Sequence, residues 1–236
     1  MTWLGSNLKM ALDVSSTLKL IDCVREYSDR GPRALVVSAP FLAAAAERAR
    51  GTSLQIGAQG CSRFERGAHT GEVSALDIAE AGCSFVMVGH AERVAAGESI
   101  EDMADQVSMC RRAGLSVILC VGEPEQVAED SGDLIAQADD VLRGRIEAGD
   151  VIAYEPHWSI GEQGRAAPAD YVARRMGRLR EHLGSEATVV YGGSVSTANA
   201  AQLLAVPGNS GIFVGRAAWT PEGWRELESI AEGNST

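Results

Sequence analysis

Lysine is scarce in this sequence, occurring only at positions 9 and 19 of 236 residues. Schiff-base catalysis requires a lysine amine at the reacting carbonyl, and the absence of lysine beyond position 19 argues against this chemistry. Lys and Arg together number 21 against 32 Asp and Glu, which gives a formal net charge of −11. This acidic balance argues against a broad surface for nucleic acid or anionic lipid. An anionic small molecule would need a local positive pocket.

Cysteine motifs and long apolar runs are also missing. The five cysteines are odd in number and show no CxxC spacing, which is typical of a reducing compartment and not of a disulfide framework or a zinc site. No run of about 18 apolar residues occurs, and the opening MTWLGSNLKM lacks a basic leader followed by an apolar core. We therefore expect no membrane span and a cytoplasmic location.

Short apolar runs alternate with segments of helical character along the whole chain. Continuous apolar runs rich in Val, Ile and Leu are typical of parallel strands, which are buried on both faces. The predicted strands are Trp3–Leu8, Ala34–Ser38, Leu54–Ala58, Phe85–Gly89, Val117–Val121, Val151–Tyr154, Thr188–Tyr191 and Ile212–Val214.

The intervening segments are polar on one side and rich in Ala, Leu, Arg and Glu, which predicts helices. They are Val14–Arg30, Ala43–Arg50, Ser74–Ala81, Ile100–Ala113, Asp133–Glu147, Ala169–Leu183, Thr197–Leu204 and Pro221–Ala231. No low-complexity linker or composition shift divides the chain, so we expect one α/β domain over residues 1–236. Repeated strand–helix units in this length favour a closed (β/α)8 barrel over an open doubly wound sheet. In such barrels the chemistry comes from residues just past the carboxyl ends of the strands.

The sixth predicted strand, Val151–Tyr154, stops at Glu155, and a proline then forces the chain out of strand geometry. Trp158, Ile160 and Gly161 follow as an apolar segment that ends in a flexible residue. Such a segment suits a loop that folds over a ligand and excludes water. The stretch is typical of a base under a lid, and the alternative is a surface glutamate at an ordinary strand-to-helix turn.

Asn7 and Lys9 flank Leu8 at the end of the first predicted strand, and being two residues apart they are expected to face the same side. A lysine inside a barrel mouth is costly unless it meets an anion, and the alternative is a lysine that reaches water. His90 follows the fourth strand, and a helix starting just after it would lower the imidazole pKa. Glu92 is a candidate ion-pair partner for Lys9. Cys120 ends the fifth strand with no activating neighbour in sequence, so packing is its expected role.

Glycine-containing turns follow the last two predicted strands, in YGGSVS at Tyr191–Ser196 and FVGRAAW at Phe213–Trp219. Glycines leave backbone N–H groups unshielded, and a helix N-terminus directly after them makes an anion site. Loops after strands seven and eight of a (β/α)8 barrel recurrently bind phosphate.

Together these segments resemble the triosephosphate isomerase family, whose fold is the TIM barrel. The matching motifs occur in the family's order and cover essentially the whole chain. They are NLKM (7–10), GAHTGE (67–72), VGHAER (88–93), CVGE (120–123), AYEPHWSIG (153–161), YGGSV (191–195) and FVGR (213–216).

The resemblance implies an aldose–ketose isomerase that interconverts dihydroxyacetone phosphate and glyceraldehyde 3-phosphate without a metal or an organic cofactor. By position, Glu155 matches the family's catalytic base and His90 the neutral electrophile that polarises the carbonyl. Lys9 matches the cation that stabilises the enediolate, and Asn7 the amide beside it. A positioned base and stabilisation of the developing oxyanion are what removal of a weakly acidic proton requires.

The same resemblance assigns the phosphate of the sugar to backbone N–H groups of Gly161, Ser194, Gly215 and Arg216. Residues 158–164 match the family's lid. The segment 67–72 matches the loop that the family projects into a neighbouring subunit, with Thr70 near the partner's active site, so a homodimer is expected. A long exposed loop is the alternative reading of this segment.

Several positions depart from the family pattern. Ala91 replaces a serine, Leu8 a tryptophan and His157 a valine, and the lid reads IGEQGRAAP in place of the usual Thr-Gly-Lys segment. Arg216 stands where glycine is usual, either adding charge to the phosphate site or pointing to solvent. These changes leave open a ketose phosphate one carbon longer, an erythrulose phosphate, as the substrate.

A non-catalytic barrel that binds a sugar phosphate as a sensor or scaffold is the alternative from another class. Loss of the base, the lysine or the histidine would favour it. Glu155, Lys9 and His90 are all present, which favours an enzyme.

Overall fold

The computed structural model describes residues 1–127, 133–161, 164–184 and 187–233. Eight parallel strands pair in sequence order and close into a barrel, with β1 hydrogen-bonded to both β2 and β8. The strands are β1 (Trp3–Asn7), β2 (Arg33–Val37), β3 (Leu54–Ala58), β4 (Phe85–Val88), β5 (Ser116–Val121), β6 (Val151–Tyr154), β7 (Thr188–Tyr191) and β8 (Gly211–Val214). Each predicted strand is confirmed, and so is the predicted (β/α)8 barrel.

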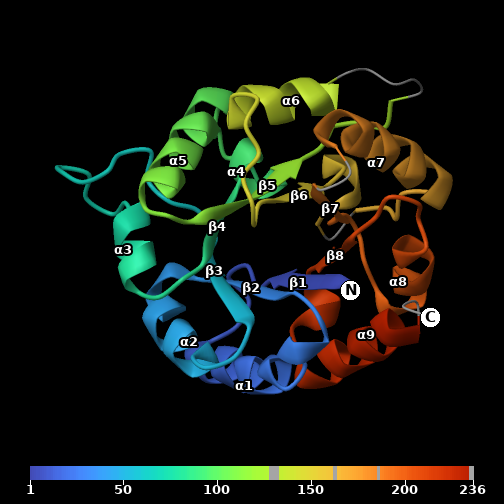
Figure 1. The fold of residues 1–236 in the computed structure, drawn as a ribbon, viewed down its shortest axis with the longest axis horizontal. Coiled ribbons are helices and arrows are strands. Elements are labelled where there is room, and N and C mark those ends of the chain that lie inside the picture. Colours follow the sequence, from blue (N-terminus) through green and yellow to red (C-terminus); the bar gives the residue numbers. More distant parts are fainter. Residues whose placement is uncertain (128–132, 162–163, 185–186, 234–236) are drawn as a thin grey trace.

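Helices surround the barrel as an outer ring (Figure 1). They are α1 (Val14–Arg25), α2 (Leu42–Ala49), α3 (Ala75–Glu80), α4 (Ala91–Ala95), α5 (Ile100–Arg112), α6 (Asp133–Leu142), α7 (Ala169–Leu183), α8 (Thr197–Leu204) and α9 (Pro221–Gly233). Short 3-10 turns are η1 (Ser28–Arg30), η2 (Ala39–Phe41), η3 (His157–Ser159) and η4 (Arg216–Ala218).

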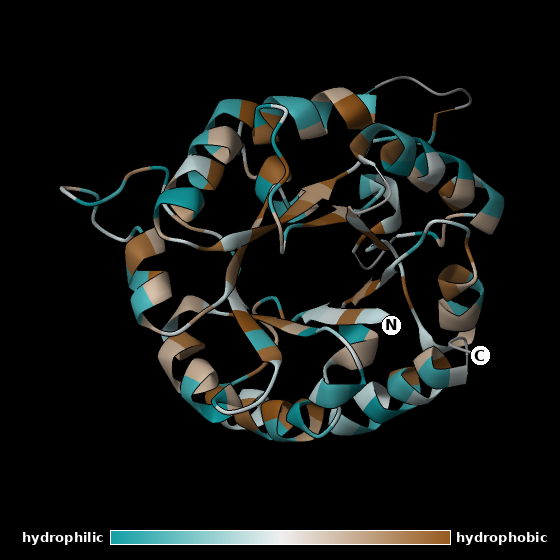
Figure 2. Ribbon diagram, viewed as in Figure 1, coloured by the Kyte–Doolittle hydropathy of each residue, from teal (hydrophilic) through white to brown (hydrophobic). Residues whose placement is uncertain are grey.

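The apolar core has two layers because successive strand residues point to opposite sides. Val36 points into the barrel interior with the side chains of Trp3, Phe85 and Phe213. Its neighbours in the strand instead belong to the larger layer between barrel and helices. Figure 2 shows hydrophobic residues concentrated on the strands and hydrophilic ones mainly on the outer surfaces of the helices.

Two predicted helices are too long. The helix predicted over Val14–Arg30 ends at Arg25, where the Ser28 hydroxyl donates to the Arg25 carbonyl at 2.9 Å and a 3-10 turn takes over. The helix predicted over Asp133–Glu147 ends at Leu142, because Arg143 and Gly144 adopt positive φ angles of 52° and 66°. Left-handed residues terminate helices.

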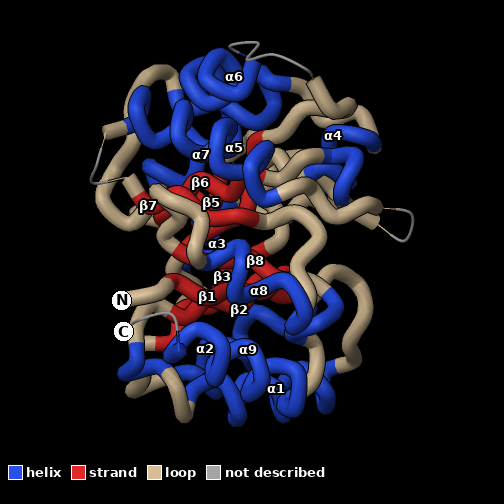
Figure 3. The backbone as a smooth tube through the Cα atoms, turned by 90° about the vertical axis from the view of Figure 1, so that its right-hand side faces the viewer, coloured by secondary structure: helices blue, strands red, loops and turns tan. Residues whose placement is uncertain are grey.

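The carboxyl ends of the strands form one rim of the barrel. Figure 3 shows the N-terminus at one end of the molecule and α4, which follows β4, toward the opposite end. The loop between β3 and α3 projects outward from the ring of helices (Figure 1), and Thr70 on it is exposed. None of the helices in the described part of the chain combines the length and apolar character needed to span a membrane.

Candidate active site

Glu155 directly follows β6, and its side chain is buried. Its backbone N–H donates to the Val121 carbonyl at 2.8 Å, which extends the strand pairing by one residue. The site is closely packed, since a Cβ added at Gly192 would lie 2.8 Å from Glu155 Oε1. Glycine at this turn therefore gives the carboxylate its space.

Burial raises the pKa of Glu155 to about 8, against the opposing effects of the Lys9 charge and the Cys120 thiol. Desolvation disfavours the charged form of a carboxyl group. Among the described residues no hydrogen-bond partner reaches Glu155 Oε2. A buried carboxylate oxygen without a partner is unusual and is available to a ligand.

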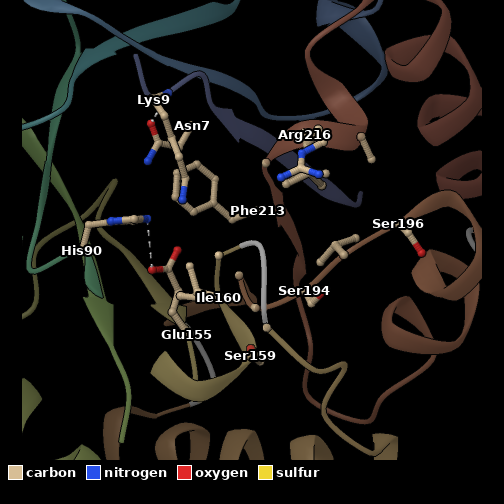
Figure 4. Close-up of a pocket in the computed structure, with 18 of the residues that line it drawn as sticks. Asn7, Lys9, His90, Glu155, Ser159, Ile160, Ser194, Ser196, Phe213 and Arg216 are labelled. Carbon is tan, nitrogen blue, oxygen red and sulfur yellow. Dashed lines mark hydrogen bonds and ion pairs between the residues drawn. The ribbon is translucent and has the colours of Figure 1, made fainter. Parts of the chain in front are cut away.

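His90 is the N-cap of α4 and is 4% exposed. Its Nδ1 accepts the backbone N–H of Glu92 at 3.2 Å, so the proton of the neutral ring is on Nε2. Nε2 lies 3.8 Å from Glu155 Oε2 (Figure 4). Burial first, and then the Lys9 charge, lowers the pKa of His90 to about 4. The ring is therefore neutral at physiological pH. The pKa is lowered as expected from the sequence, but by burial and the Lys9 charge and not by the helix N-terminus on which that expectation rested.

Lys9 reaches the same region from β1. Its Nζ lies 2.7 Å from Glu92 Oε1, which confirms the predicted ion pair. Lys9 and Asn7 were expected to face the same side because they are two residues apart in a strand. That reason was wrong for Lys9, because β1 ends at Asn7 and Lys9 adopts a left-handed φ of 49°. This conformation costs a non-glycine residue roughly 1–2 kcal/mol. The Lys9 N–H donates to Asn7 Oδ1 at 2.9 Å, which helps to hold it.

Two side chains that sequence reasoning missed also hold Lys9. The Gln59 amide donates to the Lys9 carbonyl at 2.6 Å, and the Ser38 hydroxyl donates to the same oxygen at 3.0 Å. Gln59 also donates to Asn7 Oδ1 at 3.3 Å. Both residues directly follow strands, at β3 and β2, and this position at a strand end was the available signal.

A pocket of about 610 Å³ opens between these side chains and the turns after β7 and β8. In Figure 4, His90, Lys9 and Glu155 lie on one side, and Ser194, Ser196 and Arg216 on the other. The predicted site residues that line it are Asn7, Lys9, His90, Glu92, Glu155, Gly161, Ser194, Gly215 and Arg216. Arg216 lines the pocket and is exposed at its rim.

Comparison with known proteins identifies the family. The family model described as triosephosphate isomerase matches residues 2–231. The chain belongs to the triosephosphate isomerase family. It is therefore an isomerase.

Curated relatives carry two names. A triosephosphate isomerase of Synechococcus sp. (strain JA-2-3B'a(2-13)) is 39% identical over 197 residues, covering 80% of this chain and 78% of the relative. A triosephosphate isomerase of Halorhodospira halophila is 37% identical over 233 residues, covering 90% and 94%. An L-erythrulose-1-phosphate isomerase of Brucella abortus is 32% identical over 243 residues, covering 95% and 94%.

The isomerase has a buried polar cluster at the start of the predicted lid, centred on Glu123. Glu123 Oε1 accepts the Tyr171 hydroxyl at 2.6 Å, the Tyr154 hydroxyl at 2.9 Å and the Trp158 indole N–H at 3.2 Å. The Trp158 bond attaches the first residue of the predicted lid to Glu123, which directly follows the strand β5 and Gly122. Residues 162 and 163 of the predicted lid lie outside the described residues. Sequence reasoning missed the cluster, because Tyr171 lies in α7 and not at the end of a strand, so the convergence of strand ends does not bring it to Glu123.

Two of the predicted supporting residues of the isomerase do not line the pocket. Cys120 is 1% exposed in the barrel interior, and burial raises its thiol pKa well above the ordinary value, which fits the predicted packing role. Thr70 is exposed on the loop that leaves the barrel. Within residues 1–127, 133–161, 164–184 and 187–233, no group of three or more His, Cys, Asp or Glu could hold a metal ion.

Proposed function

We propose that this isomerase interconverts dihydroxyacetone phosphate and glyceraldehyde 3-phosphate through an enediolate. The observation that carries the proposal is the facing pair of Glu155 Oε2 and His90 Nε2, 3.8 Å apart in a pocket that also contains the Lys9 ammonium. A base, a neutral proton donor and a cation around one space are the groups that a proton transfer beside a carbonyl requires.

In the proposed first step, the Glu155 carboxylate removes a proton from the substrate carbon next to the carbonyl. The electron pair of that C–H bond forms the carbon–carbon double bond of the enediolate, and the carbonyl oxygen gains the negative charge. The same carboxyl group then returns the proton to the neighbouring carbon, which produces the isomeric sugar phosphate. A base with a pKa of about 8 suits this work, because its acidity is close to the working pH.

His90 and Lys9 stabilise the oxyanion in this proposal. The imidazole is neutral, so His90 Nε2–H donates to the oxygen on which charge develops and can move a proton between the two substrate oxygens. The Lys9 ammonium supplies the compensating charge, and Glu92 holds it at 2.7 Å. Asn7 supports the Lys9 backbone. Preorganised groups of this kind cost no rearrangement during the reaction.

The phosphate of the substrate is assigned to the glycine-containing side of the pocket, with backbone N–H groups of Gly161, Ser194, Gly215 and Arg216 as donors. The lid over this side excludes water from the enediolate. We further propose a homodimer through the projecting loop 67–72, with Thr70 next to the partner's pocket, and a cytoplasmic location.

A tetrulose phosphate is the second candidate substrate. Two observations favour it: a relative named L-erythrulose-1-phosphate isomerase aligns with 95% of this chain, and Arg216 adds a cation at the rim of the pocket. A substrate with one more carbon would place its phosphate farther from Glu155. A guanidinium at the rim can reach such a phosphate with two parallel hydrogen bonds.

The test is the turnover of dihydroxyacetone phosphate and of both erythrulose phosphate enantiomers by the purified protein, with Glu155→Gln as the control. We expect turnover of the triose to exceed that of either tetrulose by orders of magnitude. A preference for one tetrulose enantiomer would instead establish the second candidate, and Arg216→Gly should then lower that preference. Equal inactivity of wild type and control on all three compounds would leave only a binding role and would overturn the enzyme mechanism.

A further inference from the structure

Trp219 joins the two halves of the pocket, although it matches none of the residues assigned to the reaction. It directly follows η4, the turn that begins with Arg216, and it lines the pocket. Its indole Nε1–H donates to the main-chain carbonyl of Asn7 at 2.9 Å, which spans 212 positions of sequence. One side chain thus connects the turn after β8 with the end of β1.

The strand pairing explains why this bond matters. The ladder between β1 and β8 ends at the Ser6–Val214 pair, so Asn7 is the first residue of β1 beyond its backbone partners in β8. There the chains separate to form the mouth of the pocket. The Trp219 indole supplies a donor to the Asn7 carbonyl at that point and ties the two chains together beyond the ladder.

Asn7 connects the Trp219 hydrogen bond to Lys9. Its main-chain oxygen accepts the Trp219 indole, and its side-chain oxygen accepts the Lys9 backbone N–H at 2.9 Å. Lys9 adopts a left-handed backbone, which is a conformation that depends on such surrounding contacts. On the other side, Trp219 is fixed to the phosphate turn, since its own N–H donates to the Arg216 carbonyl at 3.2 Å. The turn is anchored by the fully buried Ala218.

We propose that Trp219 is a positioning residue that sets the distance between the phosphate turn and the Lys9 ammonium. This inference rests on the proposed function, because it assumes that phosphate binds at the turn and that Lys9 faces the oxyanion. Substrate held at the turn is then presented to Lys9 in a fixed geometry. Losing the indole N–H should reduce turnover while leaving the affinity of the turn for phosphate intact.

Trp219→Phe removes the N–H and keeps an aromatic ring. The matched control is Trp224→Phe, because the Trp224 indole also donates at 2.9 Å, to Glu228 Oε1, on the other side of the barrel wall from the pocket. Measurements are kcat and KM on the substrate that the wild type turns over fastest, the inhibition constant of inorganic phosphate, and the unfolding midpoint. For Trp219→Phe we expect kcat about tenfold lower and the phosphate inhibition constant within about twofold of wild type. For Trp224→Phe we expect a lower unfolding midpoint and an unchanged kcat.

A double-variant cycle separates positioning from general damage. In a Lys9→Ala background, Trp219→Phe should lower kcat by less than about twofold, because the group that it positions is gone. The inference would be overturned if Trp219→Phe lowered kcat by the same factor in the wild-type and Lys9→Ala backgrounds. It would also be overturned if Trp219→Phe raised the phosphate inhibition constant and left kcat unchanged. If Trp219→Phe does not fold, Trp219→Leu supplies the same comparison. Wild-type inactivity on all substrates would overturn the proposed function itself, whereas an active wild type with an equally active Trp219→Phe would overturn only the role of Trp219.

Discussion

Glu228 and Glu155 are buried on opposite sides of the strand layer, and they differ in the hydrogen bonds that their carboxylate oxygens accept. Glu228 of α9 accepts Arg33 Nε at 2.6 Å and the Trp224 indole at 2.9 Å on one oxygen, and Arg33 Nη2 at 2.7 Å on the other. Glu155 is equally buried, but its Oε2 has no hydrogen-bond partner among the described residues. That oxygen lies 3.8 Å from His90 Nε2.

The difference is the one expected between a structural carboxylate and the proposed catalytic base. A buried ion pair with all its hydrogen bonds satisfied holds its position and its charge, and breaking it is costly. A buried carboxyl group without that compensation has a raised pKa and retains the capacity to take up a proton. Burial alone therefore does not distinguish Glu155, and neither does an oxygen without a hydrogen bond, because Glu123 is also buried and its Oε2 has none either. Glu155 differs in that it lines the pocket and its unpaired oxygen lies opposite His90 there.

The largest expected effect comes from exchanging each glutamate for glutamine. Glu155→Gln should lower kcat by at least about 10³-fold, because the amide cannot act as the base. Glu228→Gln should leave kcat within about twofold of wild type and lower the free energy of unfolding by about 3–5 kcal/mol, because the buried Arg33 loses its partner. Steady-state kinetics and denaturant unfolding on both variants check the pair. Similar activity losses in the two variants would remove the distinction between the carboxylates.

The pH dependence of activity should be large for the same reason. In the proposed mechanism the ionised form of Glu155 is the base, and burial raises its pKa to about 8. The value of kcat/KM should then fall about tenfold per pH unit below 8. His90, with a pKa of about 4, should add no loss above pH 5. A pH–rate profile of the free enzyme measures this, and a flat profile between pH 6 and 8 would contradict the raised pKa of Glu155.

Stability should change with pH in the opposite sense. The folded protein keeps the Glu155 proton up to about pH 8, whereas the unfolded chain loses it near 4.5. The unfolded state therefore binds fewer protons in this window, and the free energy of unfolding falls as pH rises from 4.5 to 8. Glu155→Gln lacks this contribution, so its stability relative to wild type should increase across the window. Urea unfolding of both proteins at pH 5 and pH 8 tests the direction of this change. A difference in unfolding free energy between the two proteins that is the same at both pH values would contradict it.

A smaller effect is expected from Gly192→Ala. The added methyl would lie 2.8 Å from Glu155 Oε1, so the carboxylate must shift. A displacement of this kind should lower kcat about 10- to 100-fold with little change in the unfolding midpoint. Gly51→Ala is a useful comparison, because no atom lies within 4 Å of a Cβ there, although its φ of 78° strains any side chain. Unchanged kcat in Gly192→Ala would show that the position of Glu155 is not critical.

The sequence was sufficient to predict the barrel and the meeting of Asn7, Lys9, His90 and Glu155 at one pocket. Parallel strands in a closed barrel all end at the same rim, so residues after different strands converge whatever their separation. Continuous apolar runs indicated the strands to within one residue. The pairing of Lys9 with Glu92 followed from the same convergence.

The supporting contacts could not be predicted in the same way. Gln59, Ser38 and Trp219 each donate a hydrogen bond to a main-chain oxygen, and such bonds leave no periodic pattern in the sequence. The bonds from Gln59 and Ser38 end on the carbonyl of Lys9, whose backbone is left-handed. The sequence predicted two helices that extend too far, past Arg25 and past Leu142. The intrinsic helix propensity of the residues that follow still favours a helix, although the chain leaves helical geometry there.

The most direct test of the central claim, that Glu155 is the base, is deuterium incorporation into dihydroxyacetone phosphate. The substrate is incubated in D2O with the protein, and loss of the proton signal at the carbon beside the carbonyl is followed by NMR. The account predicts incorporation with wild type and Glu228→Gln, and incorporation at least about 10³-fold slower with Glu155→Gln. Incorporation at the wild-type rate with Glu155→Gln would contradict it.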